Sequence, residues 1–288
     1  MNVWCSNRLF RVCSVLCVLL AWGGLSPWIA TAESVPVDEN LLVLVSDTHI
    51  HHEGPIVVNE NLQFDSVALF KRVVDDVLRM NPRPAAVLIM GDLIHQGTAD
   101  TPYEMLREIL RPWDEAGIPY YLALGNHDQP PRFFKIFPEW KEKMVPGCCA
   151  WKASFKNIDF LVLETTDYSN GWYGIHPKVQ KEWLDAQLAR QTRPVFVCGH
   201  HDWELMREKP ALKNPHVQGW ICGHRHDFLT KTYPDGVREL RIPTTAHAMI
   251  PNSGYLLMRV TEDGYRFTFV PLRDDSHDTG KEIFLKRI

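Results

Sequence analysis

Short apolar runs alternate with amphipathic segments from Leu41 onward, and this alternation most restricts the fold. Residues 41–45 predict a buried strand, and apolar side chains recur at helical spacing over residues 64–80. A strand over 86–90, a helix over 103–116 and a strand over 120–124 complete the series. A strand-helix-strand-helix-strand order predicts a largely parallel sheet with right-handed crossovers.

The second half of the chain predicts mainly short strands. Residues 151–155 and 160–163 predict a hairpin around Asn157, and residues 177–190 predict a helix with proline in its first turn. Further strands are predicted over 195–198, 217–222, 228–232, 239–242, 255–260 and 265–270, with hairpin turns at Asp235-Gly236 and Asp263-Gly264. Residues 129–150 lack clear periodicity and predict a long loop or insertion. We therefore expect one α/β domain over 33–288, with two packed sheets and helices outside them.

The first 32 residues have the pattern of a cleavable signal peptide. Arg8 and Arg11 precede an apolar run, and Ala30-Thr31-Ala32 provides the small residues of a cleavage site before Glu33. The apolar core is short for a membrane span, so we expect cleavage rather than a retained anchor. The mature chain would then be periplasmic or secreted, with no stable membrane span.

The composition after residue 32 argues against a nucleic-acid interface and against a functional site built on cysteines. The 29 basic and 35 acidic side chains that remain give no polyanion-binding character, so no nucleic-acid partner is expected. Vicinal Cys148 and Cys149 cannot easily bridge to each other. Cys198 and Cys222 end apolar runs, where buried free thiols are expected.

Polar, metal-competent residues follow five predicted strands, and this order carries the chemistry. The carboxyl ends of strands in open α/β sheets are where ligands gather, so five clusters point toward one site. In extended backbone, residues two apart face the same side, so Asp-x-His can aim two ligands inward. The clusters are Asp47-Thr48-His49, Gly91-Asp92, Gly125-Asn126-His127-Asp128, Gly199-His200-His201 and Gly223-His224-Arg225-His226.

Each cluster alone has a simpler interpretation, since Gly-Asp is usually a turn and a lone Asp-x-His is usually a solvated strand end. Their ordered occurrence favours a metal centre. Carboxylate, imidazole and amide ligands together suit Mn, Fe or Zn better than Ca or Mg. Two such ions can clamp an in-line phosphoryl displacement.

This ordered set of motifs resembles the calcineurin-like metallophosphoesterase family, over about residues 41–270. The segment from Gly91 to Gly97, with Gly117-Ile118-Pro119, looks most like the cyclic-nucleotide phosphodiesterase-like branch. The resemblance implies a four-layer αββα sandwich with two mixed sheets flanked by helices. It also implies a two-metal hydrolase of phosphomonoesters or phosphodiesters.

The resemblance further implies a role for each site residue. One metal would be bound by Asp47, His49, Asp92 and His226, and the other by Asp92, Asn126, His200 and His224. A metal-bridging hydroxide would attack phosphorus. His127 would stabilise the transition state or protonate the leaving oxygen, and Asp128 would orient His127.

Two positions depart from the family pattern, and at a third the pattern does not decide between two candidate ligands. Purple acid phosphatases have a tyrosine ligand where this chain has His95, so we expect His95 to be a pocket residue. At Gly199-His200-His201 either imidazole could bind metal, and His200, directly after glycine, matches the family. Asp202 stands where relatives often have proline.

Other residues could line the same site. His51, His52 and His247 are expected to be solvated, with substrate contact as the alternative. Phe133, Phe134, Trp172 and Tyr173 could form an aromatic lid, although packing onto the sandwich is favoured. Arg225 should point away from the ligands and form a salt bridge.

These patterns predict an exported phosphoesterase that acts on a small phosphate ester. The alternative is a metal-binding sensor on the same fold that has lost catalysis. The sequence identifies neither the substrate-binding residues nor the oligomeric state.

Overall fold

The computed structural model describes residues 35–59, 62–168, 172–174, 177–246, 252–274 and 276–288, and the predicted parallel strands form the centre of its first sheet. Strands β1 (Val37–Val45), β4 (Arg83–Met90) and β5 (Tyr120–Ala123) run parallel. Strands β14 (Gly254–Val260), β15 (Gly264–Pro271) and β16 (Glu282–Lys286) extend it antiparallel, in the order β16-β15-β14-β1-β4-β5.

The second sheet has the order β12-β13-β11-β10-β7-β6. Its central strands β7 (Asp159–Val162), β10 (Val195–Cys198), β11 (Val217–Cys222) and β13 (Arg238–Arg241) run parallel. Strands β6 (Trp151–Ser154) and β12 (Leu229–Thr232) are its antiparallel edges. The turns at Asp235-Gly236 and Asp263-Gly264 connect β12 to β13 and β14 to β15, as predicted.

Strand β10 shows how the two sheets pack. Its side chains alternate, so Phe196 lies in the core between the sheets, while Val195 and Val197 pack with helix α5 (Lys178–Arg190). The Phe196 ring contacts Tyr265 of β15 with centroids 4.9 Å apart. The inner faces of the two sheets therefore form one apolar core.

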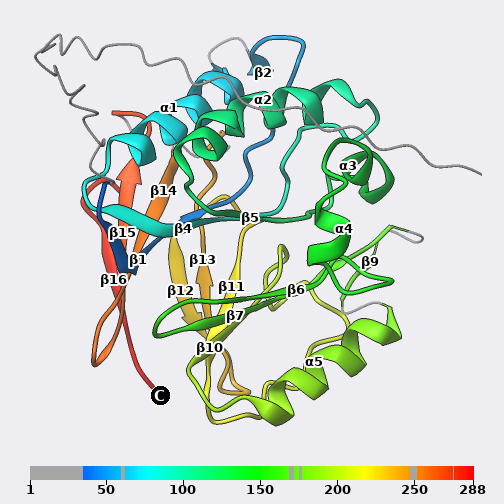
Figure 1. Cartoon of the computed structure of the whole chain (residues 1–288), viewed down its shortest axis with the longest axis vertical. Helices are drawn as coiled ribbons and strands as arrows, with labels where there is room; N and C mark the ends of the chain where they lie inside the picture. Colours follow the sequence, from blue (N-terminus) through cyan, green and yellow to red (C-terminus); the bar gives the residue numbers. More distant parts are fainter. Residues whose placement is uncertain (1–34, 60–61, 169–171, 175–176, 247–251, 275) are drawn as a thin grey trace, which may run out of the picture. The chain divides into compact units, whose positions relative to one another are not determined.

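Two helices cover the outer face of the first sheet, opposite α5 (Figure 1). Helix α1 (Ser66–Arg79) begins at Asp65, whose carboxylate accepts a hydrogen bond from the Ala68 N–H at 2.9 Å. Helix α2 (Thr101–Ala116) ends at Gly117, which has the left-handed conformation that glycine favours. The four-layer αββα prediction is confirmed.

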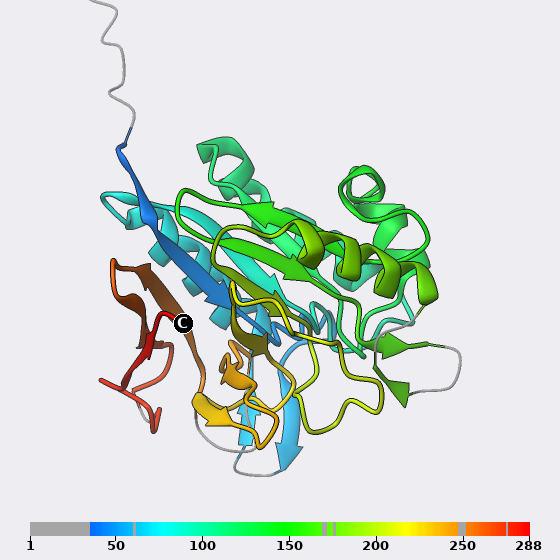
Figure 2. The same ribbon diagram turned by 90° about the horizontal axis from the view of Figure 1, so that it is seen from below.

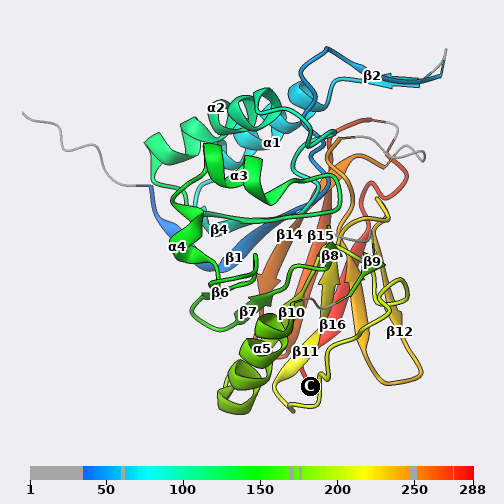
Figure 3. The same ribbon diagram turned by 90° about the vertical axis from the view of Figure 1, so that its right-hand side faces the viewer.

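The prediction of a loop over 129–150 was wrong. Residues there form helices α3 (Pro130–Ile136) and α4 (Trp140–Lys143), which are too short to show helical periodicity in the sequence. Strand β16 and two small hairpins were not predicted. The hairpins are β2 (Ile56–Asn59) with β3 (Leu62–Phe64), which projects from the body in Figure 2 and Figure 3, and β8 (Thr166–Asp167) with β9 (Trp172–Tyr173).

The N-terminal 1–32 segment lies outside the described residues, so the signal peptide stays a prediction. Among the helices that the structure describes, none is long and apolar enough to span a membrane. Cys148, Cys149, Cys198 and Cys222 are free and buried, as predicted for Cys198 and Cys222.

Candidate metal centre

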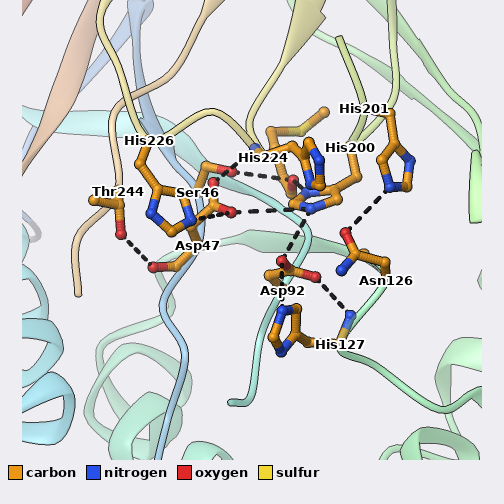
Figure 4. A network of polar contacts seen from close by, with 12 residues as sticks. Ser46, Asp47, Asp92, Asn126, His127, His200, His201, His224, His226 and Thr244 are labelled. Atoms are coloured by element: carbon orange, nitrogen blue, oxygen red, sulfur yellow. Dashed lines mark hydrogen bonds and ion pairs between the residues drawn. The ribbon is translucent and has the colours of Figure 1, made fainter. Parts of the chain in front are cut away.

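The loops that follow five parallel strands meet at one edge of the sandwich, and their polar side chains face one another (Figure 4). The loops after β1, β4 and β5 come from the first sheet, and those after β10 and β11 come from the second. These loops hold Asp47, His49, Asp92, Asn126, His127, His200, His201, His224 and His226.

Backbone hydrogen bonds fix the first two loops against each other. The Asp47 N–H donates to Gly91 O at 3.1 Å, and the His49 N–H donates to Asp92 O at 3.0 Å. The Thr48 hydroxyl donates to Leu93 O at 2.6 Å. Asp47 and Asp92 are therefore held side by side by the backbone of their loops.

The backbone of these loops is left-handed rather than extended. Five non-glycine residues in the described part of the chain have positive φ, between 42° and 66°, and all five are predicted ligands: Asp47, His49, Asp92, His224 and His226. The extended geometry predicted for the Asp-x-His and His-x-His pairs was therefore wrong. Such conformations cost free energy and concentrate at functional sites.

Two glycines allow close approach between the loops. A Cβ atom on Gly125 would lie 2.2 Å from Asp92 Oδ1, and one on Gly223 would lie 1.9 Å from Ser46 Oγ and 2.5 Å from Asp47 Oδ2. A side chain at either position would collide with the neighbouring loop. Glycine at both positions therefore lets the loops approach closely enough to bind the same metal ions.

One group of ligand atoms comes from Asp47, His49 and His226. His226 Nε2 lies 3.2 Å from Asp47 Oδ1 and 3.3 Å from His49 Nε2. Asp47 and His49 are buried, and His226 is half-buried. This group contains three of the four residues predicted for the first metal, with the fourth, Asp92, 3.8 Å from His49 Nε2.

A second group joins Asp92 and His200 to Asp47. His200 Nε2 lies 3.1 Å from Asp92 Oδ2 and 3.9 Å from Asp47 Oδ1. The His200 Nδ1–H donates to Met90 O at 2.9 Å, which turns Nε2 toward the carboxylates. Asp47 belongs to both groups, and Asp92 Oδ2 lies within 4 Å of a histidine from each, as a bridging ligand would.

The third group contains His200, His201 and His224, so the structure places both imidazoles of the His200-His201 pair at the centre. His200 faces the two carboxylates. His201 Nε2 instead lies 3.1 Å from Asn126 Oδ1, and its Nδ1 lies 2.7 Å from Thr165 Oγ1. These contacts favour His200 as a ligand and give His201 the role of holding the Asn126 amide.

His127 lies beside the centre, with Nε2 3.9 Å from Asp92 Oδ2. Its backbone N–H donates to Asp92 Oδ1 at 2.8 Å, and its Nδ1 donates to the carbonyl oxygen of His95 at 2.6 Å. The predicted orienting role of Asp128 was wrong. The Asp128 carboxylate accepts from the Gly125 and Leu93 N–H groups and from the Tyr103 hydroxyl, so it holds the loop instead.

Burial and mutual charge set the protonation of these side chains. Burial alone would raise the pKa of Asp92, but His200, His49 and His127 outweigh it and hold that pKa well below its usual value. Burial alone would lower the pKa of His200, yet Asp92 and Asp47 raise it to about 10. Burial lowers the pKa of His49 to about 3 and that of His224 to about 4.

Metal loading at pH 7 is therefore expected to release at least one proton, from His200 and from His226, because only neutral imidazoles bind metal. Burial alone would lower the pKa of His226, but Asp47 raises it. The proton on His200 stabilises the folded, metal-free chain fully below pH ~6.5, and this contribution is lost as pH rises through about 10. Apparent metal affinity should accordingly rise about tenfold per pH unit between pH 7 and 10. Titration calorimetry in buffers of different ionisation enthalpy measures the released proton, and a buffer-independent enthalpy would contradict the expectation.

An ion pair joins two of the ligand loops. Arg225, between His224 and His226, points away from them, and its Nε lies 2.7 Å from Oδ2 of buried Asp202. The predicted salt bridge of Arg225 is thus confirmed. Asp202 directly follows His201, so the pair ties the loop after β10 to the loop after β11.

Arg225→Met is expected to weaken metal binding by about tenfold, because it frees these two loops from each other. Metal affinity is measured by competition with a chromogenic chelator. The control is Lys231→Met, which removes the exposed pair between Lys231 and Glu204 (2.9 Å) and should leave metal affinity unchanged. Equal affinities in the two variants would show that the Arg225 pair does not position ligands.

The donor set fits divalent metal ions. Asp47 Oδ1 and His200 Nε2 are buried and make no hydrogen bond of regular geometry among the described residues, with ion-pair contacts to His226 Nε2 (3.2 Å) and Asp92 Oδ2 (3.1 Å), respectively. Buried polar atoms rarely lack a partner, and here they face other carboxylate and imidazole groups. A metal ion would satisfy both atoms and would neutralise the paired carboxylates.

The other residues predicted to line the pocket differ in where the structure places them. Phe133 is buried and stacks on Phe137, so packing rather than a lid is confirmed there. Tyr173 stacks on His201, with ring centroids 3.9 Å apart. His51 belongs to none of the candidate ligand groups among the described residues, and its Nδ1 contacts Gly54 O at 3.1 Å. His247 and the side chain of Trp172 lie outside the described residues.

Sequence reasoning missed Thr165 and Tyr103, which support the centre. Thr165 follows β7 and contacts His201, while Tyr103 of α2 contacts Asp128 and accepts the Gln129 N–H at 2.7 Å. Thr165 occupies the same strand-end position as the ligand clusters and could have been found by that signal. Tyr103 lies within a helix and offered none.

Comparison with known proteins agrees with the family resemblance of the sequence motifs. The family model described as "Calcineurin-like phosphoesterase" matches residues 41–228. A "Probable cyclic nucleotide phosphodiesterase" from Rhodococcus erythropolis is 26% identical over 219 residues, 69% of this chain and 68% of that protein. The human "Serine/threonine-protein phosphatase CPPED1" is 31% identical over 147 residues, 46% of this chain and 43% of that protein.

A solved structure of a dimetal phosphatase from Danio rerio has the same fold. It superposes with a TM-score of 0.63 at 15% identity, covering 86% of this chain and 99% of that one. The resemblance read from the motifs, including that to cyclic-nucleotide phosphodiesterase-like proteins, is confirmed.

Proposed function

Because this chain belongs to the calcineurin-like phosphoesterase family and is a metal-dependent phosphoester hydrolase, we propose that it cleaves a small phosphomonoester or phosphodiester with two metal ions. The observation that carries this proposal is the convergence of buried carboxylate and imidazole groups, with the ligand atoms of Asp47, Asp92 and His200 within 4.8 Å of one another. Mn, Fe or Zn suits such a mixed ligand set.

The first ion would be held by Asp47, His49, Asp92 and His226, and the second by Asp92, Asn126, His200 and His224. When bound, two such ions activate water as a nucleophile and neutralise charge on the phosphoryl group. The remaining residues position the ligands. Met90 O fixes His200, His201 holds Asn126, and the backbone contacts of Asp47 and Asp92 set their separation.

His127 would act on the leaving group. Its Nδ1–H is committed to His95 O, so Nε2 is the nitrogen free to face the substrate. Nε2 lies 3.9 Å from Asp92 Oδ2, the oxygen that is also 3.8 Å from His49 Nε2, so it borders the proposed metal centre. A proton on Nε2 would pass to the departing ester oxygen, or its N–H would stabilise charge there.

Side-by-side assays of the metal-loaded chain test this function. The substrates are 4-nitrophenyl phosphate, bis(4-nitrophenyl) phosphate, a cyclic nucleotide and a DNA oligonucleotide. At least one small ester should be hydrolysed, and a chelator should abolish the activity. Two bound metals with no turnover on any substrate would favour the sensor alternative, whereas hydrolysis of DNA alone would contradict the small-molecule assignment.

We further propose that the protein acts outside the cytoplasm, on the signal-peptide pattern of residues 1–32. Expression of the full chain, with fractionation and N-terminal sequencing, tests this. The exported protein should begin at Glu33, and a cytoplasmic chain that retains Met1 would contradict export.

A further inference from the structure

His95 lies beside the candidate metal centre but belongs to neither proposed ligand set. Its ring contacts His49 (centroids 5.6 Å apart, planes at 72°) and lies nearly parallel to His127 (5.8 Å, 27°). One ring nitrogen from each of His49, His95 and His127 can be chosen so that all three lie within 4.8 Å of one another. Three imidazoles therefore lie close together beside the centre, with their nitrogens near enough to share one ligand.

The backbone of His95 is held independently of its side chain. Its N–H donates to Ile50 O at 3.0 Å, and its carbonyl oxygen accepts the His127 Nδ1–H at 2.6 Å. The imidazole makes neither contact. A change of the His95 side chain should consequently leave the position of His127 intact.

The His95 imidazole lacks a partner that its burial requires. Its Nδ1 is buried and has no hydrogen-bond partner among the described residues. Such an atom is costly to leave unpaired, so it indicates a group that arrives with a ligand.

The surroundings of His95 favour an anion as that ligand. The ring groups packed on it belong to His49, His127 and His51, the last with centroids 5.3 Å away, and none of these is a carboxylate. Asp92, the carboxylate that contacts His49 and His127, is also shared with His200. Imidazole N–H groups donate strongly to phosphate oxygens.

We propose that His95 is a substrate-contacting residue whose imidazole binds a phosphoryl oxygen beside His127. This inference rests on the proposed phosphoesterase function. His95 thereby determines how tightly the phosphate group is held and does not bind metal.

Phosphate binding by the metal-loaded chain tests the inference without relying on turnover. His95→Ala is expected to raise the Kd for inorganic phosphate at least about tenfold, the effect of one lost charge-assisted hydrogen bond. Metal content should stay equal to that of the unsubstituted chain. His95→Gln, which keeps an N–H donor, should recover part of the affinity, and thermal unfolding of both variants reports any loss of folding.

The matched control is His52→Ala, an exposed histidine from the same loop as His51, which should leave the phosphate Kd unchanged. An unchanged Kd in both His95 variants would overturn the inference, as would an unsubstituted metal-loaded chain that binds neither phosphate nor vanadate. Loss of one metal ion from His95→Ala would overturn it in favour of a ligand role. Phosphate binding without hydrolysis of any ester would reject only the proposed function. The role of His95 would still be tested by the change in the phosphate Kd of its variants.

Discussion

Asp92→Asn is expected to lower kcat/KM at least about 1,000-fold, equivalent to about 4 kcal/mol of transition-state stabilisation. Asp92 Oδ2 lies within 4 Å of ring nitrogens from His49, His127 and His200. An amide keeps the shape of this group but removes the charge that both proposed metal ions would share. Metal content should therefore fall below two ions per chain, as measured by atomic emission of dialysed protein alongside steady-state kinetics.

Asp159→Asn is the matched control for the loss of a buried aspartate. Asp159 is 3% exposed at the start of β7, beside Lys152 (3.4 Å) and Arg193 (3.6 Å). Its substitution should lower stability while leaving metal content and rate constants intact. Asp92→Ala should match or exceed the loss seen with asparagine, and an Asp92 variant with full metal content and full rate would refute the proposed centre.

His127→Ala is expected to lower kcat about 100- to 10,000-fold while both metal ions stay bound. The imidazole is outside the proposed ligand sets, and its Nε2 lies 3.9 Å from Asp92 Oδ2. The loss should be largest for alkyl esters, whose departing oxygen needs a proton, and smaller for 4-nitrophenyl esters. A series of esters with leaving groups of increasing pKa measures this difference.

His216→Ala provides the comparison, because His216 precedes β11 at the end opposite the ligand loops. It should leave every rate constant unchanged. A loss in His127→Ala that does not depend on the leaving group would argue against proton donation. Loss of metal from that variant would make His127 a ligand.

The order of the motifs predicted both the fold and the residues that form the site, because each motif directly follows a predicted strand. Each ligand cluster follows an apolar run, so finding the strand also located the loop that holds Asp47, Asp92 or His200. The short helices α3 and α4 escaped prediction because one or two turns give no measurable period. Strand β16 escaped as well, since the alternation of Glu282–Lys286 is brief and mostly exposed.

The orientation of individual side chains could not be predicted from the same motifs. Asp128 follows His127 in the chain, yet its carboxylate turns back to the Gly125 and Leu93 N–H groups. Which partner a buried carboxylate finds depends on loops from elsewhere in the chain. The left-handed backbone of Asp47 and His224 is likewise imposed by neighbouring loops rather than by local preference.

The ligand loops come from both sheets, and this arrangement has a mechanical consequence. Asp47, His49, Asp92 and Asn126 belong to the first sheet, whereas His200, His224 and His226 belong to the second. An ion held by residues from both would act as a reversible cross-link across the sandwich, in addition to the apolar core and the His200 Nδ1–H to Met90 O hydrogen bond. Resistance to unfolding would then follow free metal concentration, gaining about 4 kcal/mol at 1,000 times the dissociation constant. A low metal concentration would therefore reduce the stability of the packing between the sheets as well as the catalytic activity.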